Sequence, residues 1–269
     1  MAGKLYLVGT PIGNLGDFTY RAVDTLNNVD CIACEDTRHS SILLNHYNIH
    51  KPTMSYHKFN EKQATNKIIE MLKSGKNIAI ITDAGMPSIS DPGAILLKEV
   101  ISNNMEFELV PSATAVTTAY VGSNLGDGRF CFIGFLPTKN IDKKKLLNEY
   151  KDTTSTLIFY SATHAINDDL DFLFKTLGNK EVVIASELTK KFEKFYRGNL
   201  STLRVENAKG EFVIMVQNVP KENPLNQFEI EEHLAHYLKS GLSKMDAIKA
   251  VAKDRNVKKN EIYNFINKE

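Results

Sequence analysis

Residues 82–93, TDAGMPSISDPG, place acidic and hydroxyl side chains among glycines and prolines, directly after the apolar run at 78–81. The short apolar run predicts a buried strand of a mostly parallel sheet. Ligands bind beyond the carboxyl ends of such strands, because the loops there vary while the strands hold them in place. Asp83 comes at that end, and we expect it to contact a ligand. We interpret Asp91 and Pro92 as the N-cap and first position of the next helix.

A second segment suited to binding follows the expected first strand at 4–8. Its sequence, GTPIGNLGD at 9–17, is rich in glycine and stands between a strand and a helix, where backbone amides can approach an anion or a nucleoside. The glycine spacing matches neither the dinucleotide fingerprint G-x-G-x-x-G nor the Walker loop. We expect Asp17 to cap the helix that follows.

Two polar runs come at the ends of two further expected strands. EDTRH at 35–39 follows the strand at 29–34, and HKFNE at 57–61 follows the strand at 53–56. Runs of polar residues at such positions are costly unless they are solvated or used on a ligand. The carboxyl ends of parallel strands share one edge of a sheet, so we expect both runs near Asp83.

The order of elements predicts an α/β protein with two α/β domains. Strands alternate with helices up to residue 115, which indicates a parallel sheet, whereas the strands expected at 156–160, 182–185 and 211–217 are less separated by helices and predict a mixed sheet. A Gly-rich linker at 122–128 and a second linker at 218–226 divide the chain. We predict an N-terminal α/β domain at 1–118, a C-terminal α+β domain at 119–220 and a small helical module at 225–269, with helices at 230–239, 243–255 and 260–266.

Composition excludes several classes of protein. The 42% hydrophobic and 24% charged residues are ordinary for a globular chain, and 33 basic against 32 acidic side chains mean that nucleic-acid binding would depend on local patches. One patch lies between 240 and 260, with six basic and two acidic residues. It fits a helix-turn-helix that touches a phosphate backbone and, equally, a solvated helical appendage. With no signal sequence, no membrane-spanning stretch and three cysteines, we expect a cytoplasmic protein without membrane contact.

The C-x-x-C formed by Cys31 and Cys34 could suggest zinc or redox chemistry. On a strand, residues three apart point to opposite faces, so the two sulfurs could not share a metal. His39 and His46 could share a helix face, but two histidines alone are more often surface residues than a site. We therefore expect no metal centre.

Seven motifs spread over residues 8 to 216 resemble the ribosomal RNA small subunit methyltransferase I family. They are VGTPIGNLGD, CEDTRHS, SYHKFNE, TDAGMPSISDPG, GFLPTK, ELTKKFEKFYRG and KGEFVIMV, in the order of the family. The resemblance implies the tetrapyrrole methylase fold and a homodimer that holds S-adenosyl-L-methionine (SAM) in the cleft between two domains. It also implies methyl transfer to the ribose 2′-hydroxyl of a cytidine in the decoding region of 16S rRNA, with the 30S subunit as partner. Glycine and two arginines of the family pattern are replaced by Ser112, Ala165 and Ser186.

The resemblance also guides the choice of site residues. For the donor site we nominate Thr10, Asp83, Gly85, Met86, Thr114, Ala115, Tyr160, Leu188 and Phe212. For the acceptor side we nominate Glu35, Asp36, Arg38, His57 and Asn60. Asp36 or His57 would take the proton of the hydroxyl group, and Arg38 would pair with phosphate.

Two other functions stay open at this point. Corrin and porphyrin methylases carry G-x-G-P-G-D after the first strand, where this chain has G-T-P-I-G-N. They also lack the EDTR run. Both differences favour RNA as the substrate over a tetrapyrrole such as a precorrin. The replaced arginines and Ser112 allow a catalytically silent RNA-binding or assembly factor. Binding of SAM in a calorimeter would separate that factor from either enzyme.

Overall fold

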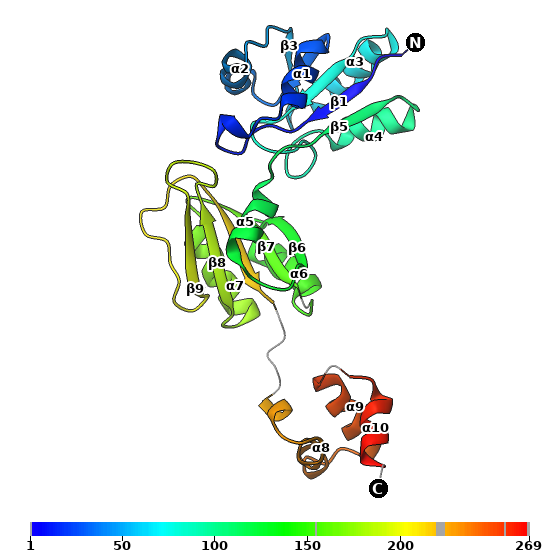
Figure 1. The fold of residues 1–269 in the computed structure, drawn as a ribbon, viewed down its shortest axis with the longest axis vertical. Helices are drawn as coiled ribbons and strands as arrows, with labels where there is room; N and C mark the ends of the chain where they lie inside the picture. The colour runs from blue at the N-terminus through cyan, green and yellow to red at the C-terminus, as the bar shows by residue number, and fades with distance from the viewer. Residues whose placement is uncertain (1, 154, 219–223, 256, 268–269) are drawn as a thin grey trace. The chain divides into compact units, whose positions relative to one another are not determined.

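The computed structural model describes residues 2–153, 155–218, 224–255 and 257–267. The chain divides into two compact units, Met1–Asn218 and Val219–Glu269. The first unit contains two β-sheets with their helices, and the second contains the last three helices (Figure 1).

The first sheet has five parallel strands in the order β3-β2-β4-β1-β5. These are β1 Leu5–Val8, β2 Cys31–Cys34, β3 Thr53–Ser55, β4 Ile78–Ile81 and β5 Phe107–Val110. Every residue of β2 and β4 is buried, as continuous apolar runs in a parallel sheet covered on both faces should be. The loops that follow all five strands therefore leave from one edge of the sheet.

Helices cover both faces of this sheet. α3 Glu61–Lys73 and α4 Ala94–Ser102 pack on one face, and α1 Tyr20–Asn28 and α2 Thr37–His46 pack on the other. Cys31 belongs to the first core and Cys34 to the second, and both thiols are free. The prediction that the two sulfurs point to opposite faces is confirmed.

The second sheet is mixed, as predicted. Its order is β6-β7-β10-β8-β9, with β6 parallel to β7 and the other pairs antiparallel. The strands are β6 Phe130–Phe135, β7 Thr156–Ala162, β8 Glu181–Ser186, β9 Lys194–Asn199 and β10 Glu211–Gln217. The edge strand β9 was not predicted, because its sequence KFYRGN lacks the apolar run that identified β4 and β10.

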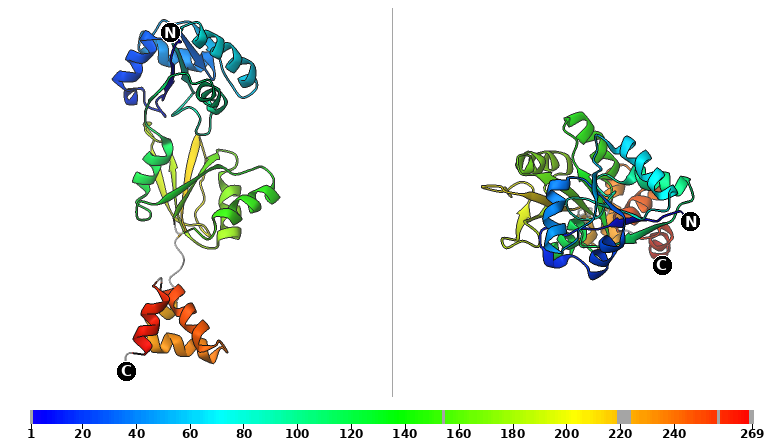
Figure 2. Two further views of the ribbon diagram at one scale, coloured as in Figure 1. Left: turned by 90° about the vertical axis from the view of Figure 1, so that its right-hand side faces the viewer. Right: turned by 90° about the horizontal axis from the view of Figure 1, so that it is seen from above.

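α5 Ala115–Ser123 covers one face of the second sheet, and α6 Asn140–Tyr150 and α7 Ile166–Leu177 cover the other (Figure 2). The boundary expected at 118/119 falls inside α5, whose buried residues Val116 and Ala119 pack with the second sheet. The connection from the first sheet to the second is therefore made by residues 111–114, which precede the glycine-rich linker predicted at 122–128.

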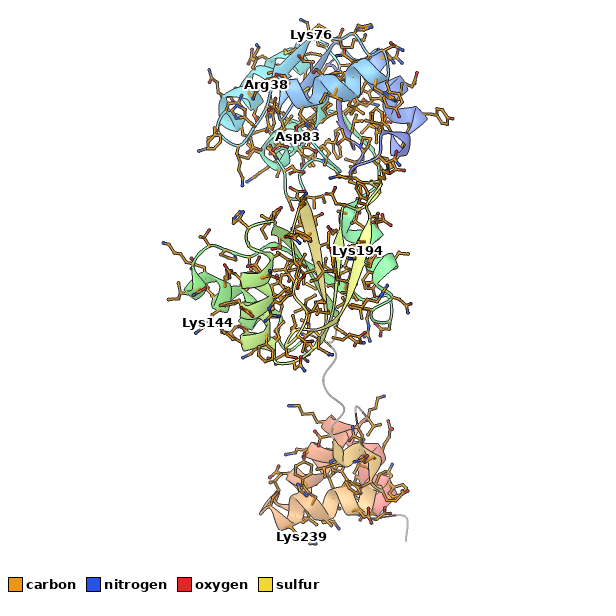
Figure 3. The ribbon with its side chains drawn as sticks, turned by 90° about the vertical axis from the view of Figure 1, so that its left-hand side faces the viewer. Arg38, Lys76, Asp83, Lys144, Lys194 and Lys239 are labelled. Atoms are coloured by element: carbon orange, nitrogen blue, oxygen red, sulfur yellow. The ribbon has the colours of Figure 1, made fainter. Side chains whose placement is uncertain are left out.

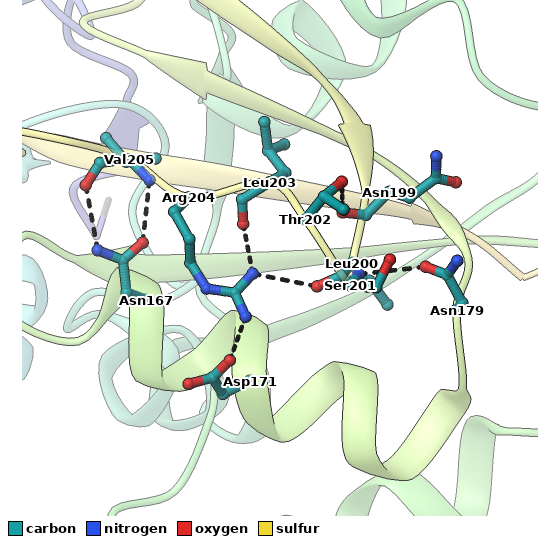
Figure 4. A network of polar contacts seen from close by, with 10 residues as sticks. All are labelled: Asn167, Asp171, Asn179, Asn199, Leu200, Ser201, Thr202, Leu203, Arg204 and Val205. Carbon is teal, nitrogen blue, oxygen red and sulfur yellow. Dashed lines mark hydrogen bonds and ion pairs between the residues drawn. The ribbon is translucent and has the colours of Figure 1, made fainter.

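A polar network fastens the loop after β9 to α7 (Figure 4). Asn167 on α7 donates to the carbonyl of Val205 at 3.1 Å and accepts from its N–H at 3.0 Å. Arg204 pairs with Asp171 and donates to the carbonyl of Leu203. These bonds satisfy backbone groups of Leu203 and Val205 in the loop that follows β9.

The second unit is a small helical cluster. The short 3-10 helix Pro224–Gln227 precedes α8 Ile230–Lys239, α9 Lys244–Asp254 and α10 Lys259–Ile266. Leu234, Ile248, Val251 and Ile262 form its core. The three predicted helices are confirmed to within one or two residues. A helix-turn-helix that touches RNA stays a prediction.

Two predicted helix caps are wrong. Asp17 lies in the 3-10 helix Leu15–Asp17, and Thr19 caps α1 by accepting from the N–H of Ala22. α4 begins at Ala94, with Gly93 and not Asp91 at the N-cap. Gly93 has φ +137°, which L side chains rarely adopt, so the helix can start only after it and Asp91 stays in the loop.

None of the helices in the described parts of the chain combines the length and apolar character needed to cross a bilayer.

Candidate active site

Loops of the first sheet and strands of the second enclose a cavity of about 500 Å³, within the range of pockets that hold small molecules. The first sheet contributes Ile12, Glu35, residues 83–86 and residues 89–91. The start of α5 contributes residues 114–117. The second sheet and its loops contribute Phe130, Phe132, Phe135, Tyr160, Glu187, Leu188, Lys190 and residues 211–213. The cavity therefore lies at the carboxyl edge of the parallel sheet, where the sequence predicted a binding site.

The loops after β1 and β4 are tied together behind the cavity wall. Thr10 and Gly85 exchange backbone hydrogen bonds of 2.9 and 3.1 Å, and the buried Thr10 hydroxyl donates to the carbonyl of Thr82 at 3.0 Å. The N–H of Gly9 donates to the carbonyl of Val110, which extends the tie to β5. This hydrogen bonding holds Asp83 and its neighbours in place.

Ser112 fits at a position where the resemblance implies glycine. Its hydroxyl donates to the carbonyl of Thr10 at 3.2 Å, and its backbone is not in the left-handed region. The side chain of Ser112 fits because its neighbour Gly9 has no side chain. A Cβ added at Gly9 would lie only 2.6 Å from the Met86 sulfur and 2.7 Å from the Ser112 Cβ. The serine thus leaves the tie between the loops intact.

Five carboxylates line the cavity, from Glu35, Asp83, Asp91, Glu187 and Glu211, and that of Glu187 is paired with Lys190 at 3.0 Å. Burial, followed by the charges of Glu35, Asp83 and Glu211, raises the pKa of Asp91 to about 6 against the opposing charge of Lys58. Like charges in a partly desolvated site repel one another, so the cavity favours a positively charged ligand.

Aromatic rings form the opposite wall. Phe132 and Phe135 contact Tyr160 edge-on, with ring centroids 4.9 and 5.4 Å apart. Burial is the main cause that raises the pKa of the Tyr160 hydroxyl to about 12, and the negative charges of Asp91 and Glu211 contribute to the same shift. The phenol is therefore neutral at physiological pH and can donate a hydrogen bond.

Eight of the nine residues nominated for the donor site line this one cavity. They are Asp83, Gly85, Met86, Thr114, Ala115, Tyr160, Leu188 and Phe212. The ninth, Thr10, lies behind the wall and positions Gly85. Thr114 also caps α5 by accepting from the N–H of Thr117 at 3.4 Å.

The residues nominated for the acceptor side are more scattered. Glu35 lines the cavity, and its pKa is raised by burial. Asp36 is outside the wall and is the N-cap of α2, accepting from the N–H groups of Arg38 and His39. Its carboxylate also pairs with the exposed Arg38 guanidinium at 3.4 Å, and these bonds lower its pKa.

His57 and Asn60 lie in the loop between β3 and α3 and do not line the cavity. The His57 N–H donates to the Asn60 side chain at 2.8 Å, and the Asn60 amide donates to the carbonyl of Ser55 at 3.1 Å. The His57 Nδ1 atom is buried without a hydrogen-bond partner among the described residues. These contacts fix the loop next to the site.

The sequence prediction included Tyr160 but missed the phenylalanines of the aromatic wall and the position of Asp91. Phe130 and Phe132 alternate on one face of β6, and a register shift between Phe132 and Gly134 brings Phe135 to the same cavity. The alternation was visible in FCFIGF, whereas the register shift was not. Asp91 was interpreted as a cap because Asp-Pro is a common helix start.

Among the described residues, no three His, Cys, Asp or Glu side chains gather in a group that could hold a metal ion.

The fold and cavity place the chain in a known class. Residues 4–204 match the family of Tetrapyrrole (Corrin/Porphyrin) Methylases, to which the chain belongs. Solved structures agree at the level of the fold. A diphthine synthase has a TM-score of 0.65 at 12% identity over 80% of this chain and 90% of its own. A uroporphyrin-III-C-methyltransferase from Thermus thermophilus has a TM-score of 0.60 at 16% identity over 81% of this chain and 100% of its own.

Within that class, full-length relatives define the family more narrowly. Ribosomal RNA small subunit methyltransferase I of Bacillus subtilis is 42% identical over 97% of this chain and 93% of its own length. The protein of the same name from Haemophilus influenzae is 40% identical over 98% of this chain and 96% of its own. The chain is a member of the ribosomal RNA small subunit methyltransferase I family, as its motifs indicated.

Proposed function

We propose that this chain transfers a methyl group from SAM to the ribose 2′-hydroxyl of a cytidine in the decoding region of 16S rRNA. The observation that carries the proposal is the acidic, aromatic-walled cavity to which the loops of both sheets contribute. The names of the full-length relatives support rRNA of the small subunit as the substrate. The low identity to the solved tetrapyrrole methylases gives no support to a tetrapyrrole substrate.

The residues of the cavity fit SAM. Asp83 and its neighbouring carboxylates attract the positive charges of the donor, and aromatic faces such as that of Tyr160 stabilise a cation. Ala115 and Gly85 leave room for the donor against the backbone. SAM, when bound, supplies a methyl group on a sulfonium that is already a good leaving group. The protein has to align the acceptor oxygen and help its proton leave.

For the proton acceptor we propose Asp91 in place of Asp36 or His57. The carboxylate of Asp36 is engaged by α2 and by Arg38, which lower its pKa and make it a weak base. Asp91 lines the cavity, no hydrogen bond to its carboxylate is found among the described residues, and its pKa of about 6 is closer to physiological pH. A base is most effective when its pKa lies near the working pH. Arg38 stays our proposal for a phosphate contact.

Methylation of 30S subunits tests the function. Subunits from cells without this methyltransferase are incubated with the chain and SAM carrying a tritiated methyl group, and the label is mapped on 16S rRNA. We expect one ribose methyl group in the decoding region, detected as a bond resistant to alkali. A labelled base, or SAM binding without any transfer to the subunit, would contradict the proposal. Transfer of the label to a precorrin in a separate incubation would contradict it as well. Naked 16S rRNA tested in parallel shows whether the assembled subunit is required.

A bulky side chain in the cavity should prevent donor binding. Ala115→Trp is expected to weaken SAM affinity at least about tenfold, because Ala115 lines the cavity and the indole would fill part of it. Val121→Trp is the matched control, since Val121 is 80% exposed on the same helix. Calorimetry with SAM measures both. Equal affinities for the two variants would show that the donor binds elsewhere.

A homodimer, which the resemblance implies, and a cytoplasmic location, which the sequence predicts from its composition, are further parts of the proposal. Analytical ultracentrifugation at several protein concentrations measures the first, and fractionation of cells measures the second. A mass corresponding to one chain at all concentrations would contradict the dimer.

A further inference from the structure

Two lysine–phenylalanine pairs on loops beside the cavity carry solvent-exposed phenylalanine rings. Phe59 is 98% exposed and Phe192 is 75% exposed. Single exposed apolar side chains are ordinary, but each of these follows a lysine, Lys58 or Lys191. One pair comes from a loop of the first sheet and the other from a loop of the second. Neither phenylalanine belongs to a hydrophobic core.

The first pair lies in the short loop between β3 and α3. The charge of Lys58 lowers the pKa values of Glu35 and Asp91, so the lysine is close to the cavity wall. The ring of Phe59 is 6.0 Å from that of His57, at an angle of 65°. The hydrogen bonds from His57 and Asn60 hold the backbone of this loop, so the exposed ring of Phe59 is carried by an ordered segment.

The second pair continues directly from the cavity wall. Leu188 and Lys190 line the cavity, and Phe192 follows two residues later. Thr189 has φ +64°, uncommon for a β-branched residue, and its N–H donates to the Glu193 carboxylate at 2.7 Å. Such strain persists where the surrounding structure fixes the backbone. The backbone of this loop therefore has a defined conformation.

The basic and aromatic character continues onto the edge strand β9. Lys191 Nζ is 5.7 Å from the centre of the Phe192 ring, and Lys194 Nζ is 4.4 Å from the centre of the Tyr196 ring. Figure 3 labels Lys194 on this strand and Asp83 among the loops of the first sheet. Phe192 is exposed and Tyr196 is half-buried. Lysines interleaved with aromatic rings form the kind of surface that binds single-stranded nucleic acid.

The negative charge of the cavity also favours single-stranded RNA as the ligand of this surface. Carboxylates from Glu35, Asp83 and Asp91 would repel the phosphates of a polyanionic substrate, so the phosphates must be held outside the wall. Lys58 and Lys191 are cations next to that wall. Unpaired RNA bases stack on aromatic side chains, and such stacking tolerates any base because every base has a π-face.

Resting on the proposed function, we infer that residues 57–60 and 190–194 bind single-stranded RNA beside the target nucleotide. Phe59 and Phe192 each stack on a base, and Lys58 and Lys191 pair with phosphates. The methyl acceptor would then be presented to the cavity as an unpaired nucleotide.

Tryptophan fluorescence tests the stacking directly, because the chain contains no tryptophan. Phe59→Trp and Phe192→Trp each introduce one reporter. The probe is a single-stranded oligoribonucleotide of about 12 nucleotides, compared with the same strand annealed to its complement. We expect the single strand to quench both reporters and the duplex to leave them unchanged. Absence of binding at low salt, or binding without quenching, would overturn the inference. So would quenching that follows protein concentration alone, because it would indicate contact between copies of the chain.

Alanine variants measure the contribution of each ring. Phe59→Ala and Phe192→Ala should each weaken binding of the single strand about tenfold, and Lys191→Gln should reduce the salt dependence by about 0.7 in the slope of log affinity against log salt. Tyr20→Ala is the control, since Tyr20 is an aromatic residue 97% exposed on α1. Variants that bind like the unmodified chain would overturn the inference.

SAM calorimetry and 30S methylation separate the two proposals. If the unmodified chain methylates 30S subunits and the alanine variants do so equally well, the RNA surface is wrong while the function stands. If the unmodified chain binds SAM and transfers no methyl group to RNA, the proposed function itself fails.

Discussion

Replacing Asp91 by asparagine is expected to lower the rate of methyl transfer by roughly 100- to 10,000-fold, the usual contribution of a positioned general base. Asparagine keeps the shape of the side chain but cannot accept the proton of the ribose hydroxyl. SAM affinity, measured separately by calorimetry, should change only a few-fold because four other carboxylates line the cavity. In the unmodified chain, the rate should rise with pH through about 6 as Asp91 loses its proton.

The same variant should be more stable than the unmodified chain at neutral pH. The pKa of Asp91 in the folded protein, about 6, is above its ordinary value of 3.8, so the charged carboxylate destabilises the folded state above pH 6. That destabilisation disappears as the pH falls from about 6 to below 4. Allowing for the partial exposure of Asp91, we expect Asp91→Asn to raise the free energy of unfolding by about 1–2 kcal/mol at pH 7.5. The gain should vanish below pH 4.

Asp36→Asn distinguishes the two assignments of the proton acceptor. Asparagine keeps an oxygen that accepts from the N–H groups at the start of α2 and caps helices about as well as aspartate, so this variant should remain folded. If Asp36→Asn abolishes transfer while Asp91→Asn retains it, Asp36 is the base and the assignment of Asp91 is wrong. Urea denaturation at pH 4 and pH 7.5, together with single-turnover rates, measures all of these quantities.

Lys143→Met should destabilise the first unit by about 3–5 kcal/mol. Lys143 Nζ lies 2.7 Å from Asp169, and the two side chains are only 12% and 7% exposed. The other oxygen of Asp169 accepts from the Ser161 hydroxyl at 2.7 Å. Removing the lysine leaves a buried negative charge without its cation. Thermal unfolding should shift downward by about 6–20 °C.

Two further variants control this experiment. Lys144→Met removes the exposed neighbouring lysine and should change stability by less than about 0.5 kcal/mol. Adding Asp169→Asn to Lys143→Met removes the stranded charge while keeping an acceptor for Ser161, and it should restore most of the loss. A double variant as unstable as the single one would show that lost packing, and not the buried charge, dominates.

The parts of the fold that the sequence predicted well are those with strong periodicity. β4 and β10 were recognisable as nearly unbroken apolar runs, because strands covered on both faces must be apolar throughout. β9 was missed because an edge strand pairs on one side only and tolerates lysine, arginine and glycine. Its pairing with β8 is a long-range contact that no local pattern reveals.

The site was predictable where it follows from topology. Asp83 and Thr114 come after strands of one parallel sheet, so their meeting at one cavity follows from strand direction. Asp91 was misassigned because Gly93 delays the start of α4, a backbone detail that the preceding Asp-Pro conceals. The place of Phe135 in the wall depends on the register shift in β6, which only the structure reveals.

The most direct measurement is a crystal structure of the chain grown with S-adenosyl-L-homocysteine, the product left when SAM has given up its methyl group. We expect its electron density in the cavity between Asp83 and Phe212, with the sulfur facing the carboxylate of Asp91. Density at any other position, or a cavity closed by side chains while the product binds elsewhere, would contradict the assignment of the donor site.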